Sequence, residues 1–230
     1  MSKASIEEIK RVYLEASTAQ VGDVIRAMGH MGIVCDPAIR PIKLGLRFCG
    51  QAYTLQYVPH RKGDQDVGRK FRSSAMPHGV PVLATSGIID QVLWGENMMN
   101  MSRHGGAVAH VVDGYLRDLS AYLQMDFPVF CRGVTSGPVR GVEIPTTAIA
   151  MNVPVVCGGV RCDPGDIVLG DDDGVIIVPR QAAEKSVPHV KWFANFEKDK
   201  WGPACSTADL DEVTKLTKQK KEYLDKIFNL

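Results

Sequence analysis

The sequence predicts an α/β fold in which a parallel sheet is built from alternating strands and helices. Short apolar stretches alternate with helical stretches from residue 80 to residue 130, and the connections between them are short. A later stretch, residues 153–179, contains two strong turn signals, PGD and DDDG. Amphipathic helices are expected at both ends of the chain. Alternating strands and helices with short connections favour right-handed β-α-β units.

Two helices are expected at the N-terminus. The first is indicated by apolar residues at helical spacing, Ile6, Ile9 and Tyr13. The second helix has Thr18 as its expected N-cap and Gly29 as its expected end. Its apolar stripe consists of Val21, Val24, Ile25 and Met28.

The strands are expected to begin after residue 39. Loose alternation of apolar residues between Ile39 and Val58 predicts two strands separated near Gly50. The elements expected next are strands at 80–85, 107–112 and 128–130, with helices at 95–104 and 118–125 between them. The strands at 80–85 and 107–112 should be neighbours.

The last part of the chain is expected to change from strands to helices. Residues 153–179 predict a meander or hairpins, because PGD and DDDG are turn sequences. A helix is expected at 181–198, followed by a polar joint at 201–205 and a last helix capped by Ser206. This helix carries an apolar stripe that needs a partner, for which another subunit is one candidate.

Composition excludes few classes but favours a cytoplasmic globular protein. The chain has 230 residues, 45% of them hydrophobic, and a formal net charge of +1. This charge offers no reason to expect nucleic acid as a partner. A secretory signal and a membrane-spanning apolar run are both lacking in the sequence. The six cysteines form no CxxC pair, so reduced, buried thiols are expected.

The most informative stretch for chemistry is VVDGYLRDL, residues 111–119. A strand is expected to end in a turn at Asp113-Gly114, and Arg117-Asp118 then opens a helix. In open α/β sheets, ligands gather beyond the carboxyl ends of strands. An arginine there can bind a carboxylate through two hydrogen bonds. An adjacent aspartate can coordinate a hard cation through oxygen. A helix cap and a surface ion pair explain the same residues without a ligand.

A second junction between a strand and a helix lies at Gly95-Glu96, where Glu96 precedes Arg117 by 21 positions. Gly95 permits close backbone approach, and Glu96 is expected at a helix N-terminus. If both junctions share one sheet edge, Glu96, Arg117 and Asp118 face one cleft. The alternative is that Glu96 only complements the helix dipole.

The sequence lacks the motifs of several other kinds of binding or catalytic site. Counting from Asp171, the twelfth position of an EF-hand loop would be Ala182, so DDDG is a turn and not a calcium loop. The six histidines form no metal-binding pair, and His110, inside an apolar strand, is expected in the core. The sequence has no GxGxxG, Walker A or GxSxG motif.

Beyond these patterns, the chain resembles a known family. The likeness rests on GAVAHVVDGYLRDLSAYLQMDFPVFCRGVT (106–135) and MNVPVVCGGVRCDPGDIVLGDDDGVIIVP (151–179). Two upstream stretches extend it, TAQVGDVIRAMG (18–29) and LGLRFCGQAYTLQ (44–56). Together they resemble the RraA-like family. That family takes in 4-hydroxy-4-methyl-2-oxoglutarate and 4-carboxy-4-hydroxy-2-oxoadipate aldolases, which also decarboxylate oxaloacetate, and a regulator of ribonuclease E activity.

The resemblance implies a swivelling β/α/β fold, assembled as a trimer or a dimer of trimers with sites at subunit interfaces. It covers an RraA-like α/β domain at residues 18–185, and the N-terminal helix (1–17) and the C-terminal helical extension (186–230) expected from the residue patterns lie outside it. No nucleic acid or membrane is expected as a partner. The expected partners are a small 2-oxo acid and further copies of the chain.

The resemblance also implies roles for named residues. Arg117 and Asp118 match the Arg-Asp pair of the family's aldolases, with Asp118 binding Mg²⁺ or Mn²⁺ and Arg117 binding the substrate. Substrate contacts are also expected from Gly95 and from the backbone N–H groups of Glu96, Asn97 and Met98. Glu197 is the candidate for a glutamate supplied by a neighbouring subunit. The expected reaction is retro-aldol cleavage or decarboxylation, with release of pyruvate.

One departure from the family pattern bears on the substrate. Glu96 stands where the aldolases have an aspartate, so either the substrate differs or the contact is remodelled. The main alternative is a non-catalytic regulatory or interaction protein on the same scaffold. A Schiff-base aldolase using Lys43 and a phosphohistidine carrier are weaker alternatives.

Overall fold

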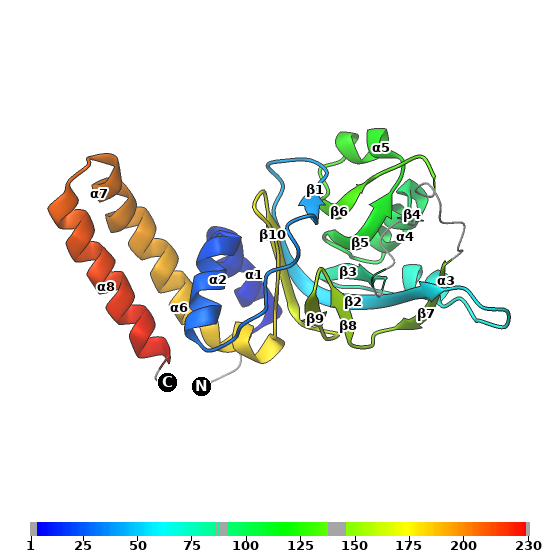
Figure 1. The fold of residues 1–230 in the computed structure, drawn as a ribbon, viewed down its shortest axis with the longest axis horizontal. Coiled ribbons are helices and arrows are strands. Elements are labelled where there is room, and N and C mark those ends of the chain that lie inside the picture. The colour runs from blue at the N-terminus through cyan, green and yellow to red at the C-terminus, as the bar shows by residue number, and fades with distance from the viewer. Residues whose placement is uncertain (1–3, 86, 88–91, 138–145, 229–230) are drawn as a thin grey trace. The chain divides into compact units, whose positions relative to one another are not determined.

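A computed structural model describes residues 4–85, 87, 92–137 and 146–228 (Figure 1). The chain forms two compact units. The sheet unit contains Ile33–Pro179, and the helical unit combines Met1–Gly32 with Arg180–Leu230. The loop expected before Gly95 lies partly outside the described residues, at 86 and 88–91. Helices and strands alternate within the sheet unit, so the predicted α/β class is confirmed.

The sheet unit contains a nine-stranded sheet among its described residues. Its strands are β1 (Arg40–Pro41), β2 (Phe48–Pro59), β3 (Gly79–Ala84), β4 (Val92–Trp94), β5 (His110–Leu116), β6 (Val129–Val134), β7 (Thr146–Met151), β10 (Ile167–Asp171) and β11 (Gly174–Val178). The order along the sheet is β1-β6-β5-β3-β2-β10-β11, with β4 on β5 and β7 on β2. Strands β2, β3, β5 and β6 run parallel. This confirms the parallel arrangement predicted for β3, β5 and β6 and the predicted pairing of β3 with β5.

Alternation along the strands divides the core between the two faces of the sheet. Val82 and Val111 are paired in register and belong to one buried cluster, which also contains Phe130 and Ile177. The next residues on the same strands, such as Val112, belong to a second buried cluster. Successive strand residues point to opposite faces, so a short apolar run fills both layers.

The helices of the sheet unit lie between its strands in sequence. They are α3 (Gly68–Arg72), α4 (Glu96–His104) and α5 (Leu119–Gln124). Met99 of α4 and Tyr122 of α5 both contribute to the second cluster. His110 is buried there as predicted, hydrogen-bonded to Ser102 at 2.6 Å and packed edge-on against Trp94.

The predicted break near Gly50 is wrong, because Gly50 lies inside the continuous strand β2. A Cβ atom at this position would overlap the carbonyl oxygen of His78 and would lie 2.9 Å from side-chain atoms of Val80 and Val108. Glycine is required here by the close approach of neighbouring backbone, which does not interrupt the strand.

The predicted turn at Asp113-Gly114 is also wrong, because both residues lie inside β5. The strand continues to Leu116, and α5 begins at Leu119, with Asp118 as its N-cap. Arg117 and Asp118 therefore form the connection between β5 and α5. The expected hairpins are confirmed, as β8 (Val155–Cys157) pairs with β9 (Val160–Cys162) and β10 with β11.

The helical unit contains α1 (Ile6–Glu15), α2 (Thr18–Ala27), α6 (Arg180–Phe196), the π-helix η1 (Glu197–Trp201), α7 (Gly202–Ser206) and α8 (Leu210–Phe228). The N-cap of α2 is Ser17 rather than Thr18, and Ser17 forms a capping box with Gln20. The predicted joint at 201–205 is helical, and Ser206 belongs to α7. Asp209 instead accepts the N–H of Glu212 at the start of α8.

The apolar stripe of α8 finds a partner inside the helical unit. Tyr223 stacks on Trp192 with ring centroids 3.5 Å apart, and Leu216 is buried beside Phe196. Within the described residues, no helix combines the length and apolar character that a membrane span requires. All six cysteines are reduced thiols outside any disulfide, and five of them are buried, as predicted.

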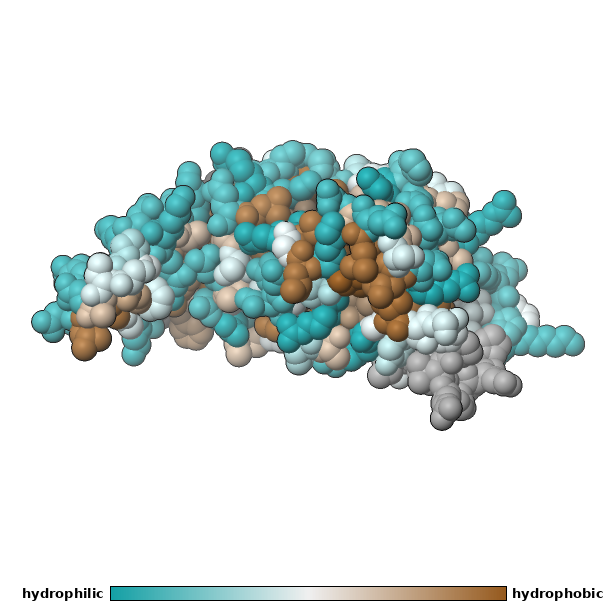
Figure 2. Space-filling view, turned by 90° about the horizontal axis from the view of Figure 1, so that it is seen from above, coloured by the Kyte–Doolittle hydropathy of each residue, from teal (hydrophilic) through white to brown (hydrophobic). Residues whose placement is uncertain are grey.

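Hydrophobic side chains also remain on the surface. Figure 2 shows a face that is mostly hydrophilic, with hydrophobic residues gathered in separate patches. Leu44 and Leu210 are 72% and 76% exposed. Single exposed apolar residues are normal in proteins, and only large contiguous patches mark binding surfaces. The expected homo-oligomer stays a prediction.

Candidate active site

The two predicted junctions between strands and helices lie side by side in the sheet unit. Strand β4 pairs with β5 in parallel, so both strands end at the same edge of the sheet. The N–H of Arg117 donates to the carbonyl of Trp94 at 3.3 Å. The N–H of Glu96 donates to Oδ2 of Asp118 at 3.0 Å. The structure thus brings Gly95, Glu96, Arg117 and Asp118 together, while their roles stay predictions.

Gly95 is required at this position by lack of space. A Cβ atom there would overlap Oδ2 of Asp118 and lie 3.3 Å from Cγ and Nε of Arg117. Its φ of −133° is accessible to any residue, so the constraint is contact and not conformation. Any side chain at position 95 would displace the Asp118 carboxylate.

Asp118 has an uncommon backbone and a partly open carboxylate. Its φ of 74° lies in the left-handed region, which aspartate tolerates better than most residues. Oδ2 accepts the Glu96 N–H and lies 3.9 Å from Nε of Arg117. Oδ1 has no hydrogen-bond partner within the part of the chain that the structure describes. The side chains of Arg117 and Asp118 are 61% and 44% exposed, so both can reach a ligand.

Arg117 and Asp118 also line a hollow beside the ends of β5 and β6. Its volume is about 570 Å³, and the other lining residues are Leu119, Val134, Thr135 and Ser136. Small-molecule sites in proteins have volumes in this range. An arginine, a carboxylate and two hydroxyls suit a small, polar, negatively charged ligand.

The predicted backbone cradle is only partly available. The Glu96 N–H is bound to Asp118, and the Met98 N–H donates to the carbonyl of Gly95 at 3.2 Å. The N–H of Asn97 has no acceptor among the described residues. One of the three predicted donors is therefore free in this conformation, at the N-terminus of α4, where helix geometry favours an anion.

Glu197 lies in the helical unit, within the π-helix η1. Its carboxylate forms an ion pair with Lys220 and accepts the side-chain amide of Gln20 at 2.6 Å. These contacts fix its orientation inside the helical unit. Its predicted role concerns a neighbouring subunit and stays a prediction, since the structure holds one chain.

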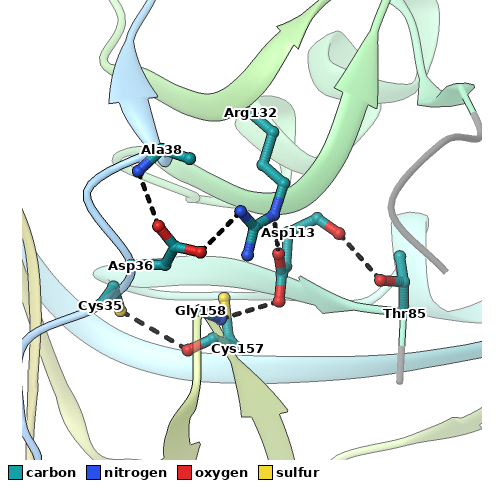
Figure 3. A network of polar contacts seen from close by, with 8 residues as sticks. All are labelled: Cys35, Asp36, Ala38, Thr85, Asp113, Arg132, Cys157 and Gly158. Carbon is teal, nitrogen blue, oxygen red and sulfur yellow. Dashed lines mark hydrogen bonds and ion pairs between the residues drawn. The ribbon is translucent and has the colours of Figure 1, made fainter. Parts of the chain in front are cut away.

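Sequence reasoning missed a largely buried polar network that holds β5 in place (Figure 3). Asp113 accepts Nε of Arg132 at 2.5 Å and the N–H of Gly158 at 2.8 Å. Arg132 also donates to Asp36 at 2.8 Å, and Thr85 donates its hydroxyl to the carbonyl of Asp113. Opposite charges at interior positions of two apolar stretches, 110–116 and 129–134, were the available signal.

The side chains around Asp118 suit a cation that is coordinated by few protein ligands and mostly by water. Among the described residues, no group of three or more His, Cys, Asp and Glu side chains is placed to hold a metal ion. Mg²⁺ commonly binds through one or two carboxylates and keeps several waters. The open Oδ1 of Asp118 fits such a cation.

Sheet topology and site chemistry together define the class of protein. It is an α/β protein with an arginine and two acids at the carboxyl edge of a parallel sheet. In open α/β sheets, this edge is where ligands bind. The family model described as RraA-like, Aldolase/RraA, matches residues 18–177. The chain belongs to this family, and its swivelling β/α/β fold is that of the family's solved structures.

Three similar proteins place the chain within the family. A Halalkalibacterium halodurans protein, provisionally named a 4-hydroxy-4-methyl-2-oxoglutarate aldolase, is 30% identical over 191 residues, which cover 83% of this chain and 85% of that protein. Protein DlpA of Legionella pneumophila is 30% identical over 182 residues, 76% of this chain but only 28% of DlpA. The structure of Streptomyces coelicolor RraAS2, of the RNase ES inhibitor RraA family, has a TM-score of 0.71 and 26% identity, covering 87% of this chain and 98% of that one.

Proposed function

We propose that this chain is a divalent-metal-dependent carbon–carbon lyase that cleaves or decarboxylates a small 2-oxo acid and releases pyruvate. The observation that carries the proposal is the convergence of Glu96, Arg117 and Asp118 at one sheet edge, with one oxygen of Asp118 open. Membership of the aldolase-containing family and the similarity to the Halalkalibacterium protein support it.

Asp118 would hold Mg²⁺ or Mn²⁺ directly. When bound, the cation supplies positive charge near the 2-oxo group, where negative charge develops as the carbon–carbon bond breaks. Arg117 binds a substrate carboxylate through two N–H groups. The free N–H of Asn97 adds a donor for the same carboxylate or a neighbouring one.

The bond changes then need one proton acceptor from the protein. In retro-aldol cleavage a carboxylate takes the C4 hydroxyl proton, and Glu96 and Glu197 are the candidates. The electrons of the C3–C4 bond move onto the 2-oxo group, which gives the enolate of pyruvate and a carbonyl product. A proton delivered to C3 completes pyruvate. Loss of CO₂ from oxaloacetate gives the same enolate.

Pyruvate release coupled to lactate dehydrogenase tests the proposal. Oxaloacetate and 4-hydroxy-4-methyl-2-oxoglutarate would each be assayed with Mg²⁺, with Mn²⁺ and with EDTA. We expect release that requires the cation and disappears in Asp118→Ala. Asp126→Ala, which removes another surface carboxylate of the sheet unit, should retain it. Full turnover by Asp118→Ala would contradict the proposal.

A regulatory role is the second candidate function, because a similar solved structure belongs to an RNase inhibitor family. On this alternative the chain acts by binding another protein and turns over no 2-oxo acid. A ribonuclease activity assay with and without the purified chain tests it. Inhibition that persists in Asp118→Ala would favour this role over the lyase.

A further inference from the structure

Tyr122 has an unexplained polar group in an otherwise apolar setting. It lies on α5, and its ring is buried in the cluster that contains Trp94, Met99 and Phe127. Its hydroxyl oxygen is buried and has no hydrogen-bond partner among the described residues. Buried hydroxyl groups in proteins almost always have a partner, so one without any needs an explanation.

The position of Tyr122 places this hydroxyl near the candidate site. Tyr122 follows Asp118 by four residues, about one helical turn. Side chains on a helix lean towards its N-terminus, so the phenol of Tyr122 extends towards the turn that Asp118 caps.

The electrostatics of the phenol agree with this placement. Burial raises the pKa of Tyr122, and the negative charge of Asp118 raises it further. Glu96 and Arg117 also act on the phenol, so it lies within electrostatic range of all three site residues. The phenol therefore keeps its proton and can donate a hydrogen bond to a nearby oxygen.

The Asp118 carboxylate has an oxygen that could accept a hydrogen bond from Tyr122. Its Oδ2 atom already accepts the Glu96 N–H, whereas Oδ1 accepts nothing within the described part of the chain. A buried hydroxyl without an acceptor thus follows, four residues later in the chain, a carboxylate oxygen without a donor. An ionised carboxylate has about four lone-pair sites, so Oδ1 can bind a cation and accept a hydrogen bond together. Carboxylates that bind metal ions are usually held by a hydrogen bond of their own.

We propose that Tyr122 is a positioning residue whose hydroxyl donates a hydrogen bond to the Asp118 carboxylate when that carboxylate binds a divalent cation. This inference rests on the proposed function, since it requires a cation at Asp118. It explains why a tyrosine occupies a site where phenylalanine would fill the same apolar space. A purely structural tyrosine would serve ring packing alone.

Tyr122→Phe separates these two roles, because it removes the hydroxyl and keeps the ring. Mn²⁺ affinity of the full chain would be measured by electron paramagnetic resonance, together with the melting temperature without metal. We expect Tyr122→Phe to weaken Mn²⁺ binding about tenfold or more. Its melting temperature should not fall, since no existing partner is lost.

Tyr13→Phe is the matched control. Tyr13 is also buried, but its hydroxyl is bonded to Ser186 at 2.7 Å inside the helical unit. This variant should lower the melting temperature and leave Mn²⁺ affinity unchanged.

Asp118→Asn distinguishes failure of this inference from failure of the proposed function. If Asp118→Asn abolishes Mn²⁺ binding and Tyr122→Phe binds Mn²⁺ like the wild type, the positioning role is overturned and the metal site stands. If the wild type shows no Mn²⁺ binding that Asp118→Asn removes, both are overturned.

Discussion

The backbone N–H of Glu96 donates a hydrogen bond to Oδ2 of Asp118 across two junctions that are 22 residues apart in sequence. This bond ties the start of α4 to the cap of α5. Glu96 lies at the positive end of the α4 dipole, which stabilises a carboxylate there. The orientation of Asp118 therefore depends on the backbone around Gly95.

Gly95→Ala should impair catalysis without disturbing the core. The added Cβ overlaps Oδ2 of Asp118, so the carboxylate must move. A displacement of about 1 Å at a reacting group can reduce the rate about a hundredfold, and we expect a loss of that order in kcat/KM for pyruvate release. Gly22→Ala is the control, because a Cβ at Gly22 has nothing within 4 Å. Wild-type kcat/KM in Gly95→Ala would show that Asp118 has another productive position.

Stability should fall with acid because of His110. Burial lowers the pKa of His110 to about 3, whereas an unfolded histidine has a pKa near 6.5. At a pH between these two pKa values, His110 binds a proton in the unfolded chain but not in the folded chain. The free energy of unfolding should therefore decrease as pH falls below about 6.5, by up to about 1.4 kcal/mol per unit from this residue.

Urea unfolding at pH 7, 6 and 5 measures this dependence. In His110→Gln, the free energy of unfolding should change less with pH, by up to the effect of one proton taken up on unfolding. In His104→Gln, which replaces an exposed histidine, the pH dependence should match that of the wild type. Equal pH slopes for the wild type and His110→Gln would mean that His110 is not the group that takes up the proton.

Much of the fold could be predicted because local patterns determine it. Alternating residues such as Val111 and Val112 reveal a strand buried on both faces, and the short connections imply parallel pairing. The wrong predictions, a break near Gly50 and a turn at Asp113-Gly114, share one physical cause. Gly50 and Asp113 are interpretable only through partners distant in sequence, such as the His78 carbonyl and the Arg132 guanidinium.

The candidate site was also only partly predictable from local patterns. Arg117-Asp118 and Glu96 were predictable because each lies at a junction between a strand and a helix, and the resemblance added the roles expected of them. Tyr122 was not predictable, since an aromatic residue in a helix normally signals only core packing. Its unpartnered hydroxyl becomes visible only when α5 is placed against the sheet.

Arg132→Met should destabilise the sheet unit strongly. The side chains of Arg132 and Asp113 are only 13% and 8% exposed, so the variant would leave a buried carboxylate without its cation. Removing one partner of a buried pair costs about 3–5 kcal/mol. Arg161→Met is the control, because the Arg161–Asp163 pair is exposed and should contribute less than about 1 kcal/mol. Equal losses in urea unfolding would argue against a structural role for the network.

Mixed oligomers should reveal whether Glu197 completes the site of a neighbouring subunit. Asp118→Ala and Glu197→Ala are each expected to be inactive alone. When the two variants are co-assembled, some interfaces combine an intact Asp118 with an intact Glu197, so pyruvate release should return. Co-assembly of Asp118→Ala with Arg117→Ala should restore nothing if both residues act from the same subunit, as their 3.9 Å contact requires. Full activity of Glu197→Ala alone would instead restrict Glu197 to its contacts with Lys220 and Gln20, and leave Glu96 as the proton acceptor.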